Sequence, residues 1–344
     1  MIKNNKPPTI NDVAAMAGTS KRTVSRVINR SPKVNEATRA RVQQVIDKLN
    51  FAPNRQARGL ASSRSYLLGL IYDVPTLFIN DIQKGILSIS GDAGYELVVH
   101  ACQFESDHLI DDVMRFVSQA KLDGVIILPP ISDIEELAVS LSKAGCNFVF
   151  LNSELGDEPW KQVVTDYLPA IADMTRHLVE FGHRDMAFIS GPRTNISSQK
   201  RQEMFVQALA SHGLELPPEM IVEGAFSHES GVKAAEKLLT QEHRPTAIFA
   251  ANDEMAFGVM NVAYDMGLRI PDDLSLVGFD GTSFSTFVVP PLTTITRQTD
   301  EMSRLGTQKL LAQIENGTQD AQSLQTMVST RFIPRKSTGP APGG

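Results

Sequence analysis

The residues with the clearest chemical potential follow Ser20. A helix starting there and turning about 100° per residue carries its basic and hydrogen-bonding side chains on one face: Lys21, Arg22, Ser25, Arg26 and Asn29. The apolar residues Val24 and Val27 fall on the opposite face. Arginine can form bidentate bonds with O6 and N7 of guanine, and hydroxyl and amide groups suit phosphate oxygens. Since the polar face carries no acid, we expect it to contact DNA, with its N-terminal end at the base edges.

A second set of polar residues follows apolar runs further along the chain. They stand where the strands of an open α/β sheet would end: Asp73, Asn152, Asp166, Asn252 and Asp280. Sheets of this kind bind ligands outside the carboxyl ends of their strands. A single Asn or Asp there is explained equally well as a turn or helix-capping residue. Their recurrence at successive strand ends favours a cleft for a polar ligand.

Three short helices are expected to position the basic face. Thr9 and Asp12 have the spacing of a capping box at a helix start. Gly18 can adopt the positive φ of a tight turn, and Ser20 is a suitable N-cap for a second helix. Two short helices joined by a glycine-containing turn are typical of a helix-turn-helix motif. A third helix, residues 36–49, is expected to pack its apolar side chains against the first two: Val42, Val45, Ile46 and Leu49.

From Tyr66 onward, apolar runs alternate with amphipathic stretches of helical length. The predicted strands are Leu67–Tyr72, Leu97–Ala101, Gly124–Leu128, Phe148–Leu151, Val163–Thr165, Met186–Ser190, Ala247–Ala250 and Leu274–Phe279. The predicted helices are Ile82–Ala93, Leu109–Ala120, Ile134–Ala144, Ala170–Phe181, Lys200–His212, Gly231–Thr240 and Met255–Met266. This alternation predicts doubly wound parallel sheets. Because about 270 residues is long for one open sheet, we expect two α/β lobes.

Charge is divided unevenly along the chain. Residues 1–64 carry 13 basic and three acidic residues, a net charge of +10, whereas the remainder carries −16 of the chain's total of −6. A basic segment joined to an acidic body indicates a polyanion-binding module attached to a part that does not bind polyanions.

Several classes of protein are disfavoured by what the sequence lacks. No apolar run approaches the roughly 18 residues of a membrane span, and no signal peptide is visible, so a cytoplasmic protein is expected. Cys102 and Cys146 cannot form a disulfide framework, and neither has a metal-site spacing. His177 and His183 suit capping or surface roles, so neither a metal nor a cofactor is predicted. The phosphate-binding pattern GxxxxGK[ST] is absent, and no enzymatic activity is expected.

Residues 53–65 form a short Pro/Asn/Arg/Ser segment between the two parts. Pro53 is expected to end the element that precedes it. Asn54 can cap a new helix, and Gly59 weakens that helix. So short a helix is marginal in water, which predicts a hinge that folds when it docks on DNA. A plain basic linker is the alternative.

These residues carry a family resemblance. Residues 9–29 read Thr9-Ile10-x-Asp12-Val13-Ala14-x-x-Ala17-Gly18-x-Ser20-x-x-Thr23-Val24-Ser25-Arg26-Val27-Ile28-Asn29. That pattern closely resembles the head of the LacI/GalR family of bacterial repressors. Further matches are Pro53-Asn54…Ala57-x-x-Leu60, Phe181-Gly182-His183-Arg184, Ser190-Gly191-Pro192, Ala251-Asn252-Asp253, Val277-Gly278-Phe279-Asp280 and Pro290-Pro291-Leu292-Thr293-Thr294-Ile295. The resemblance spans about residues 9–336 and implies a dimeric transcription regulator with a body similar to a periplasmic sugar-binding protein.

The resemblance also implies roles for individual residues that contact DNA. Lys21, Arg22 and Arg26 match base-reading positions, and Leu60 matches a leucine that wedges into the minor groove of a near-palindromic operator. Asn54 and Ala57 match neighbouring contacts. Together with the helix face, the expected DNA contacts are Thr9, Ser20, Lys21, Arg22, Thr23, Ser25, Arg26, Asn29, Asn54, Ala57 and Leu60.

In the body, the resemblance implies an effector site between the lobes. Arg201 matches the arginine that bonds effector oxygens, and Phe226 an aromatic residue that stacks on the effector. Alone, Arg201 could be a salt-bridging arginine and Phe226 a core residue. Arg297 falls where the family commonly has Gln, and could accept an anionic group on a modified sugar. The expected effector contacts are Asp73, Phe78, Asn152, Arg201, Phe226, Asn252, Asp280 and Arg297.

The sequence therefore predicts a DNA-binding repressor controlled by a small sugar-type effector. A corepressor type that responds to a nucleobase or a sugar phosphate is the alternative, which aromatic sandwiching by Phe78 and Phe226 would support. With no leucine heptads after Arg335, a homodimer is expected.

The predicted fold is an all-α helix-turn-helix head and a periplasmic-binding-protein-like core of two doubly wound parallel-sheet lobes. The expected boundaries are 1–52 for the head, 53–65 for the hinge, 66–337 for the core and 338–344 for a disordered tail. Within the core, the N-lobe is expected at about 66–164 and 296–325, and the C-lobe at about 165–293 and 326–337.

Overall fold

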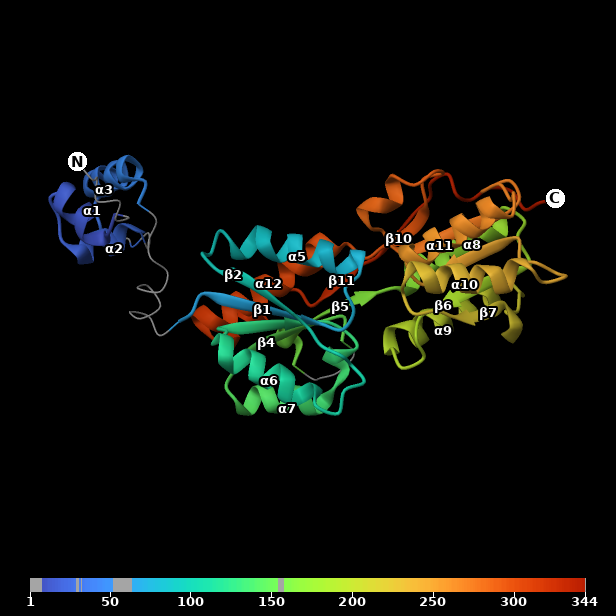
Figure 1. Ribbon diagram of the computed structural model, residues 1–344, viewed down its shortest axis with the longest axis horizontal. Coiled ribbons are helices and arrows are strands. Elements are labelled where there is room, and N and C mark those ends of the chain that lie inside the picture. Colours follow the sequence, from blue (N-terminus) through green and yellow to red (C-terminus); the bar gives the residue numbers. More distant parts are fainter. Residues whose placement is uncertain (1–7, 29–30, 32, 52–63, 154–157, 344) are drawn as a thin grey trace, which may run out of the picture. The chain divides into compact units, whose positions relative to one another are not determined.

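The computed structural model describes residues 8–28, 31, 33–51, 64–153 and 158–343. The chain divides after Tyr66 into two compact units (Figure 1). The first is a helical head and the second a pair of α/β lobes, which confirms the predicted fold class. The predicted hinge helix after Pro53 lies outside the described residues. Within the described ranges, none of the helices combines the length and apolar character of a membrane span.

The described part of the head consists of α1 (Ile10–Met16), α2 (Lys21–Ile28) and α3 (Glu36–Leu49). Val13, Val24 and Val42 are fully buried where the three helices meet. Gly18, with φ of 61°, makes the turn between α1 and α2. The Asn35 side chain caps α3 by accepting a 2.8 Å bond from the Thr38 amide. A small valine-rich core thus fixes the angle between α1 and α2.

The first lobe is built on a six-stranded sheet of order β11-β5-β4-β3-β1-β2, with every pairing parallel. Its strands are β1 (Leu67–Tyr72), β2 (Glu96–Ala101), β3 (Gly124–Ile127), β4 (Asn147–Leu151), β5 (Gln162–Asp166) and β11 (Met327–Ser329). Its helices are α5 (Leu77–Ser90), α6 (Leu109–Ala120), α7 (Glu135–Lys143), α12 (Thr299–Asn316) and α13 (Thr318–Gln322). Helices α5 and α12 cover one face of the sheet, and α6 and α7 cover the other (Figure 1).

The second lobe has a six-stranded sheet of order β12-β10-β9-β8-β6-β7, in which β12 alone runs antiparallel to its neighbour. Its strands are β6 (Met186–Ser190), β7 (Ile221–Glu223), β8 (Ala247–Ala250), β9 (Ser275–Asp280), β10 (Thr293–Thr296) and β12 (Arg331–Ile333). Its helices are α8 (Leu168–Glu180), α9 (Ile196–Ser211), α10 (His228–Leu239) and α11 (Asp253–Asp265). Helix α8 packs on α9, and α10 packs on α11.

The chain passes between the lobes three times: after β5, after β10 and after β11. The last crossing differs from the expected boundary at residue 325. Residues 327–329 belong to the first lobe, because β11 pairs in parallel with β5. Strands of three residues, such as β7, β11 and β12, carry too little periodicity to be recognised in the sequence.

Residues 337–341 are packed against the second lobe, contrary to the expectation that residues 338–344 form a disordered tail. Ser337 is fully buried, and its hydroxyl accepts a 2.7 Å bond from the Thr293 amide. The Gly339 amide donates to Ser275 Oγ at 3.0 Å, and the Ala341 amide donates to the Phe181 carbonyl at 2.8 Å. Its Pro- and Gly-rich composition indicated disorder, but specific hydrogen bonds to the second lobe hold the segment.

Candidate functional site

Helix α2 presents the predicted basic face. Val24 and Val27 anchor it to the core of the head, whereas Lys21 and Arg22 at its N-terminal end are exposed. Thr23, Ser25 and Arg26 are partly exposed. The arrangement suits a recognition helix, because apolar anchors hold it while cationic side chains remain free of the core.

Two caps set the register of this motif. At α1, the Asp12 carboxylate accepts 2.8 and 2.7 Å bonds from the amide and hydroxyl of Thr9. At α2, Ser20 Oγ accepts a 3.2 Å bond from the Thr23 amide and lies 3.0 Å from the Thr23 hydroxyl. The hydroxyls of Thr9, Ser20 and Thr23 therefore shape the helix starts as well as being candidates for phosphate contacts. The remaining predicted DNA contacts, Asn29, Asn54, Ala57 and Leu60, lie outside the described residues.

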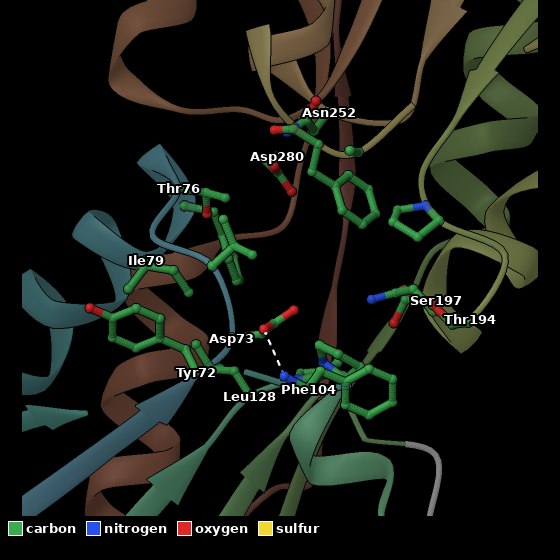
Figure 2. Close-up of a pocket in the computed structure, with 18 of the residues that line it drawn as sticks. Tyr72, Asp73, Thr76, Ile79, Phe104, Leu128, Thr194, Ser197, Asn252 and Asp280 are labelled. Carbon is green, nitrogen blue, oxygen red and sulfur yellow. Dashed lines mark hydrogen bonds between the residues drawn. The ribbon is translucent and has the colours of Figure 1, made fainter. Parts of the chain in front are cut away.

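A cavity of about 500 Å³ opens within the second unit, lined by residues of both lobes. Figure 2 shows Asp73, Thr76 and Ile79 of the first lobe facing Thr194, Ser197, Asn252 and Asp280 of the second. The cavity lies at the carboxyl ends of strands from both sheets, as expected for open α/β sheets. Of the predicted effector contacts, seven line it: Asp73, Phe78, Arg201, Phe226, Asn252, Asp280 and Arg297.

Arg201, on α9, is a buried cation with few partners. Its exposed fraction is 2%, and Nη1 donates to the Ala251 carbonyl at the end of β8. The guanidinium lies 3.9 Å from the ring centre of Phe279. Burial, together with the charge of Arg297, lowers the pKa of Arg201 to about 10, so the group stays charged near neutral pH. Its Nε is buried without a hydrogen-bond partner.

Arg297 and Asp280 form a buried ion pair beside Arg201. Arg297 Nη1 lies 3.1 Å from Asp280 Oδ1, and both side chains are 8% exposed. Arg297 Nη2 donates to the Tyr167 hydroxyl at 3.5 Å, and its guanidinium lies 3.9 Å from the Phe78 ring centre. Burial raises the pKa of Asp280, against the opposing charges of Arg297 and Arg201. The residue that departs from the family pattern thus contributes a second cation to the cavity wall.

Asn252 positions Phe226. Its Oδ1 caps α11 by accepting a 2.9 Å bond from the Met255 amide, and its Nδ2 donates to the Phe226 carbonyl at 2.8 Å. Phe226 has φ of 58°, a strained conformation for a bulky residue. Its ring tip occupies the space that a side chain at Gly191 would need, since a Cβ there would lie 2.1 Å from Phe226 Cζ. Asn252 therefore acts on the cavity partly through Phe226.

Asp73 follows β1 directly and is already engaged. Its Oδ1 accepts a 3.1 Å bond from the Phe104 amide, drawn as a dashed line in Figure 2. The contact orders the loop after β2 beside the end of β1. Asp73 retains its other oxygen for a ligand.

Asn152 does not line the cavity, contrary to the prediction. It is buried, its Nδ2 donates to Met302 Sδ at 3.1 Å, and its Oδ1 accepts a bond from the Thr165 hydroxyl. The side chain therefore joins the end of β4 to β5 and α12. Asn152 does follow the end of a strand, as predicted. Its side-chain amide, however, bonds to Met302 of α12, a helix from a distant part of the chain.

Several cavity residues escaped sequence analysis. Ser197 lies one helical turn before Arg201 on α9, a spacing that could have revealed it. Tyr167 does not line the cavity but supports both arginines, with its ring centre 5.6 Å from Arg201 Cζ and 5.9 Å from Arg297 Cζ. No local signal marks a tyrosine at such a position. The other missed lining residues with side-chain polar groups are Tyr72, Thr76, Gln103, Glu105, Ser106, Thr194 and Asn195.

One group of potential metal ligands lies apart from the predicted contacts. His100, Cys102 and Asp112 place ligand atoms within 4.8 Å of one another, with His100 Nε2 2.8 Å from Asp112 Oδ2. Burial, then the charges of Asp112 and Asp73, raise the pKa of the Cys102 thiol to about 12. The thiol is therefore protonated near neutral pH, and a metal ion would have to displace that proton in order to bind it. The sequence predicted no metal-site spacing for Cys102, although His100 stands two residues before it and Asp112 is brought beside both by the fold.

His177 and His183 have structural roles. His183 Nδ1 lies 2.9 Å from the Thr246 hydroxyl, and its Nε2 lies 2.9 Å from Ser275 Oγ and 3.0 Å from the Gly339 carbonyl. His177 Nε2 lies 2.9 Å from the Thr338 hydroxyl. Both rings hold the packed end of the chain.

Comparison with known proteins agrees with the two-part architecture. Residues 9–54 match the family described as bacterial regulatory proteins, lacI family, and residues 175–338 match the periplasmic binding protein-like domain. The probable HTH-type transcriptional repressor ExuR of Bacillus subtilis (strain 168) is 34% identical, over 96% of this chain and 98% of the relative.

Solved structures give the same result. The Lac repressor dimer bound to operator and the anti-inducer ONPF has a TM-score of 0.76 and 28% identity, covering 97% of this chain and 100% of that one. A complex of the transcriptional regulator CelR with cellobiose has a TM-score of 0.69 and 27% identity, covering 96% and 99%. The basic helix and the cavity between the lobes are thus those of a DNA-binding transcriptional repressor with an effector-binding core, not those of an enzyme. The chain belongs to the lacI family of bacterial regulatory proteins.

Proposed function

We propose that this repressor binds a small polyhydroxylated effector, a sugar or sugar derivative, between its two lobes, and that the effector lowers its affinity for the operator. The observation that carries the proposal is the lining of the cavity. Carboxylate, guanidinium and hydroxyl groups alternate there with apolar Ile79, Leu128 and Phe226. Sugar hydroxyls need both donors and acceptors, and the C–H face of a sugar ring packs on apolar surface.

The proposed control is a shift between two arrangements of the lobes. The Leu77 amide of the first lobe donates to Glu254 Oε1 of the second at 2.7 Å, and Arg297 lies over Phe78. A ligand in the cavity forms bonds to both lobes, so it stabilises the arrangement in which residues of both lobes can reach it. Repression is relieved if that arrangement holds the heads in a geometry that the operator does not fit.

The aromatic residues disfavour a nucleobase. Phe78 already has a guanidinium 3.9 Å from its ring centre, and the tip of the Phe226 ring lies against Gly191. Both rings are engaged by the protein, so Phe78 and Phe226 do not form a ready aromatic sandwich for a planar base. A corepressor that responds to a nucleobase or a sugar phosphate is retained as an outcome of the test.

A homodimer on a near-palindromic operator forms part of the proposal. Phe284, Phe287 and Val289 expose 46%, 75% and 91% of their surface on one segment of the second lobe. Clustered exposed apolar side chains favour association, and the related Lac repressor structure is described as a dimer bound to operator. Two heads would then read two half-sites. No cofactor is required besides the effector.

The test is an operator titration with the full chain. An operator is first obtained by selection from randomised duplexes, and its affinity is followed by fluorescence anisotropy with neutral sugars, sugar acids, sugar phosphates and purine bases. We expect one sugar class to weaken operator binding, and Arg201→Ala to lose that response while keeping operator affinity. Unchanged affinity with every saturating ligand would contradict allosteric control, and tighter binding with a purine would favour the corepressor.

A further inference from the structure

The buried end of the cavity carries an excess positive charge. Arg201 and Arg297 both line it with exposed fractions of 2% and 7%, and Asp280 is the buried lining carboxylate beside them. Asp280 pairs with Arg297, whereas no carboxylate of the described residues lies within 4 Å of a nitrogen of Arg201. Two guanidinium groups and one carboxylate leave one uncompensated charge. An unpaired buried charge is costly, so this wall is suited to a ligand that supplies an anion.

The arginines also have unused hydrogen-bonding capacity. A guanidinium has five N–H donors. Arg201 donates to the Ala251 carbonyl, and Arg297 donates to Asp280 and to the Tyr167 hydroxyl. The Nε atoms of both arginines are buried without a hydrogen-bond partner. Neither guanidinium is therefore satisfied by the protein alone.

The two cations are held at one place by the same aromatic residue. Their Cζ atoms lie 5.6 and 5.9 Å from the ring centre of Tyr167. Arg297 is also fixed by Phe78, and Arg201 by Phe279, each at 3.9 Å. Guanidinium groups that are already held against aromatic rings lose little freedom when they bind an anion, and their planar donors favour a bidentate acceptor.

The charges elsewhere in the cavity select among anions. The other charged lining residues, Asp73 and Glu105, are both acidic and more exposed than the arginines. They would repel a second negative charge, and the wall has only one positive charge to neutralise. A monovalent carboxylate therefore fits better than a phosphate dianion.

The remainder of the cavity suits the hydroxylated part of such a ligand. Thr76, Gln103, Thr194 and Ser197 provide neutral donors and acceptors, and Figure 2 shows Thr76, Thr194 and Ser197 around the open space. A volume of about 500 Å³ holds a small ring with some water.

We infer that the effector of this repressor is a sugar acid, a polyhydroxylated monocarboxylate whose carboxylate is bound by Arg201 and Arg297. The inference rests on the proposed function, since it specifies the ligand of the same cavity. It assigns selectivity for the acid to Arg297, the residue at which this chain departs from the family pattern.

The first experiment uses the unaltered full chain and isothermal titration calorimetry. The probes are D-galacturonate and D-glucuronate, their uncharged amides, the parent hexoses and the hexose 6-phosphates. We expect at least one uronate to bind about 10- to 100-fold more tightly than its own amide, the range for a charge-assisted bidentate bond. An amide, a hexose or a phosphate that binds as tightly as the matching uronate would overturn the sugar-acid inference while leaving the proposed function intact. Binding by purine bases alone would overturn both.

The second experiment compares two variants. Arg297→Gln retains hydrogen bonding without the charge and is expected to lower uronate affinity about 10-fold or more with little effect on the amide. Thr194→Val, which removes a neutral lining hydroxyl, serves as the matched control and is expected to weaken uronate and amide equally. Equal losses for the two ligands in Arg297→Gln would count against the inference. Because the comparison of acid with amide is made first in the unaltered protein, it does not depend on the folding of either variant.

Discussion

Glu254 of α11 accepts a 2.7 Å hydrogen bond from the backbone amide of Leu77, the first residue of α5, so a carboxylate of one lobe caps a helix of the other. An anionic acceptor at a helix N-terminus satisfies an otherwise open amide and interacts favourably with the helix dipole. The contact closes one edge of the cavity, since Thr76 and Phe78 beside Leu77 are lining residues.

Removal of this contact should loosen the lobes. We expect Glu254→Ala to weaken effector binding by about 5- to 50-fold, because a charged hydrogen bond between the lobes is lost. Glu254→Gln, which keeps the acceptor oxygen, should retain most of the affinity. Calorimetry with the best ligand measures the effect, and equal losses in both variants would show that the hydrogen bond is not the cause.

The exposed cations of α2 should carry sequence recognition. We expect Arg22→Gln to weaken binding to the selected operator about 10- to 100-fold, as for loss of one bidentate base contact. Lys48→Gln, on the exposed side of α3, is the control for net charge and should have a small effect. Anisotropy at one fixed salt concentration, with selected and scrambled duplexes, measures both variants. A loss that is the same on the two duplexes would indicate a phosphate contact instead.

Asp253 should make the stability of the core fall as pH rises towards neutrality. Burial, with the charge of Asp280, raises the pKa of Asp253 to about 7, although Thr282 and Thr294 donate hydrogen bonds to it. The folded protein therefore holds this proton more tightly than the unfolded chain, whose carboxyl titrates near about 4. Between these values the native state binds more protons, so the contribution of Asp253 to the unfolding free energy decreases with pH.

Urea unfolding at pH 5, 6, 7 and 8 tests this expectation. Asp253→Asn should flatten the dependence on pH, whereas Asp265→Asn, at the exposed end of the same helix, should leave it unchanged. An equally steep decline in Asp253→Asn and the unaltered protein would assign the effect to another group.

The exposed segment of the second lobe should stabilise the dimer. Phe287→Asp places a charge where the proposed interface needs an apolar side chain. We expect the dissociation constant of the dimer to rise about 10-fold or more. Val139→Asp, at an exposed apolar position on α7, is the matched control. Sedimentation velocity over a concentration series gives the result, and an unchanged dimer in Phe287→Asp would place the interface elsewhere.

The packed end of the chain should contribute to stability. Deletion of residues 337–344 removes partners of His183, Ser275 and Thr293, and we expect a loss of about 2–4 kcal/mol of unfolding free energy from buried polar groups left unpaired. Deletion of 342–344 alone should cost little. Thermal and urea unfolding of both truncated proteins decide the matter, and equal stability of the two would contradict a structural role for Ser337 to Ala341.

Most of the fold was predictable because its signals are local. The valine positions of α2 and α3 repeat at helical spacing, and the buried strands of both sheets are continuous apolar runs. Seven of the eight predicted effector contacts line one cavity. Asp73, Asn252 and Asp280 were predictable because strand ends of a parallel sheet meet at one edge, whereas Arg201, Phe226 and Arg297 were implied by the family resemblance.

The amino-acid sequence by itself determined the basic face of α2, the alternation of strands and helices, and the polar residues at strand ends, since each depends on neighbours within a few turns or strands. Only the tertiary structure decided that Asn152 bonds to α12 rather than lining the cavity, that Tyr167 supports two arginines, and that residues 337–341 pack against the second lobe. It also decided that Arg297 pairs with Asp280 while Arg201 does not. These outcomes depend on contacts between segments far apart in the chain, and their free energies come from burial and charge that no local pattern records.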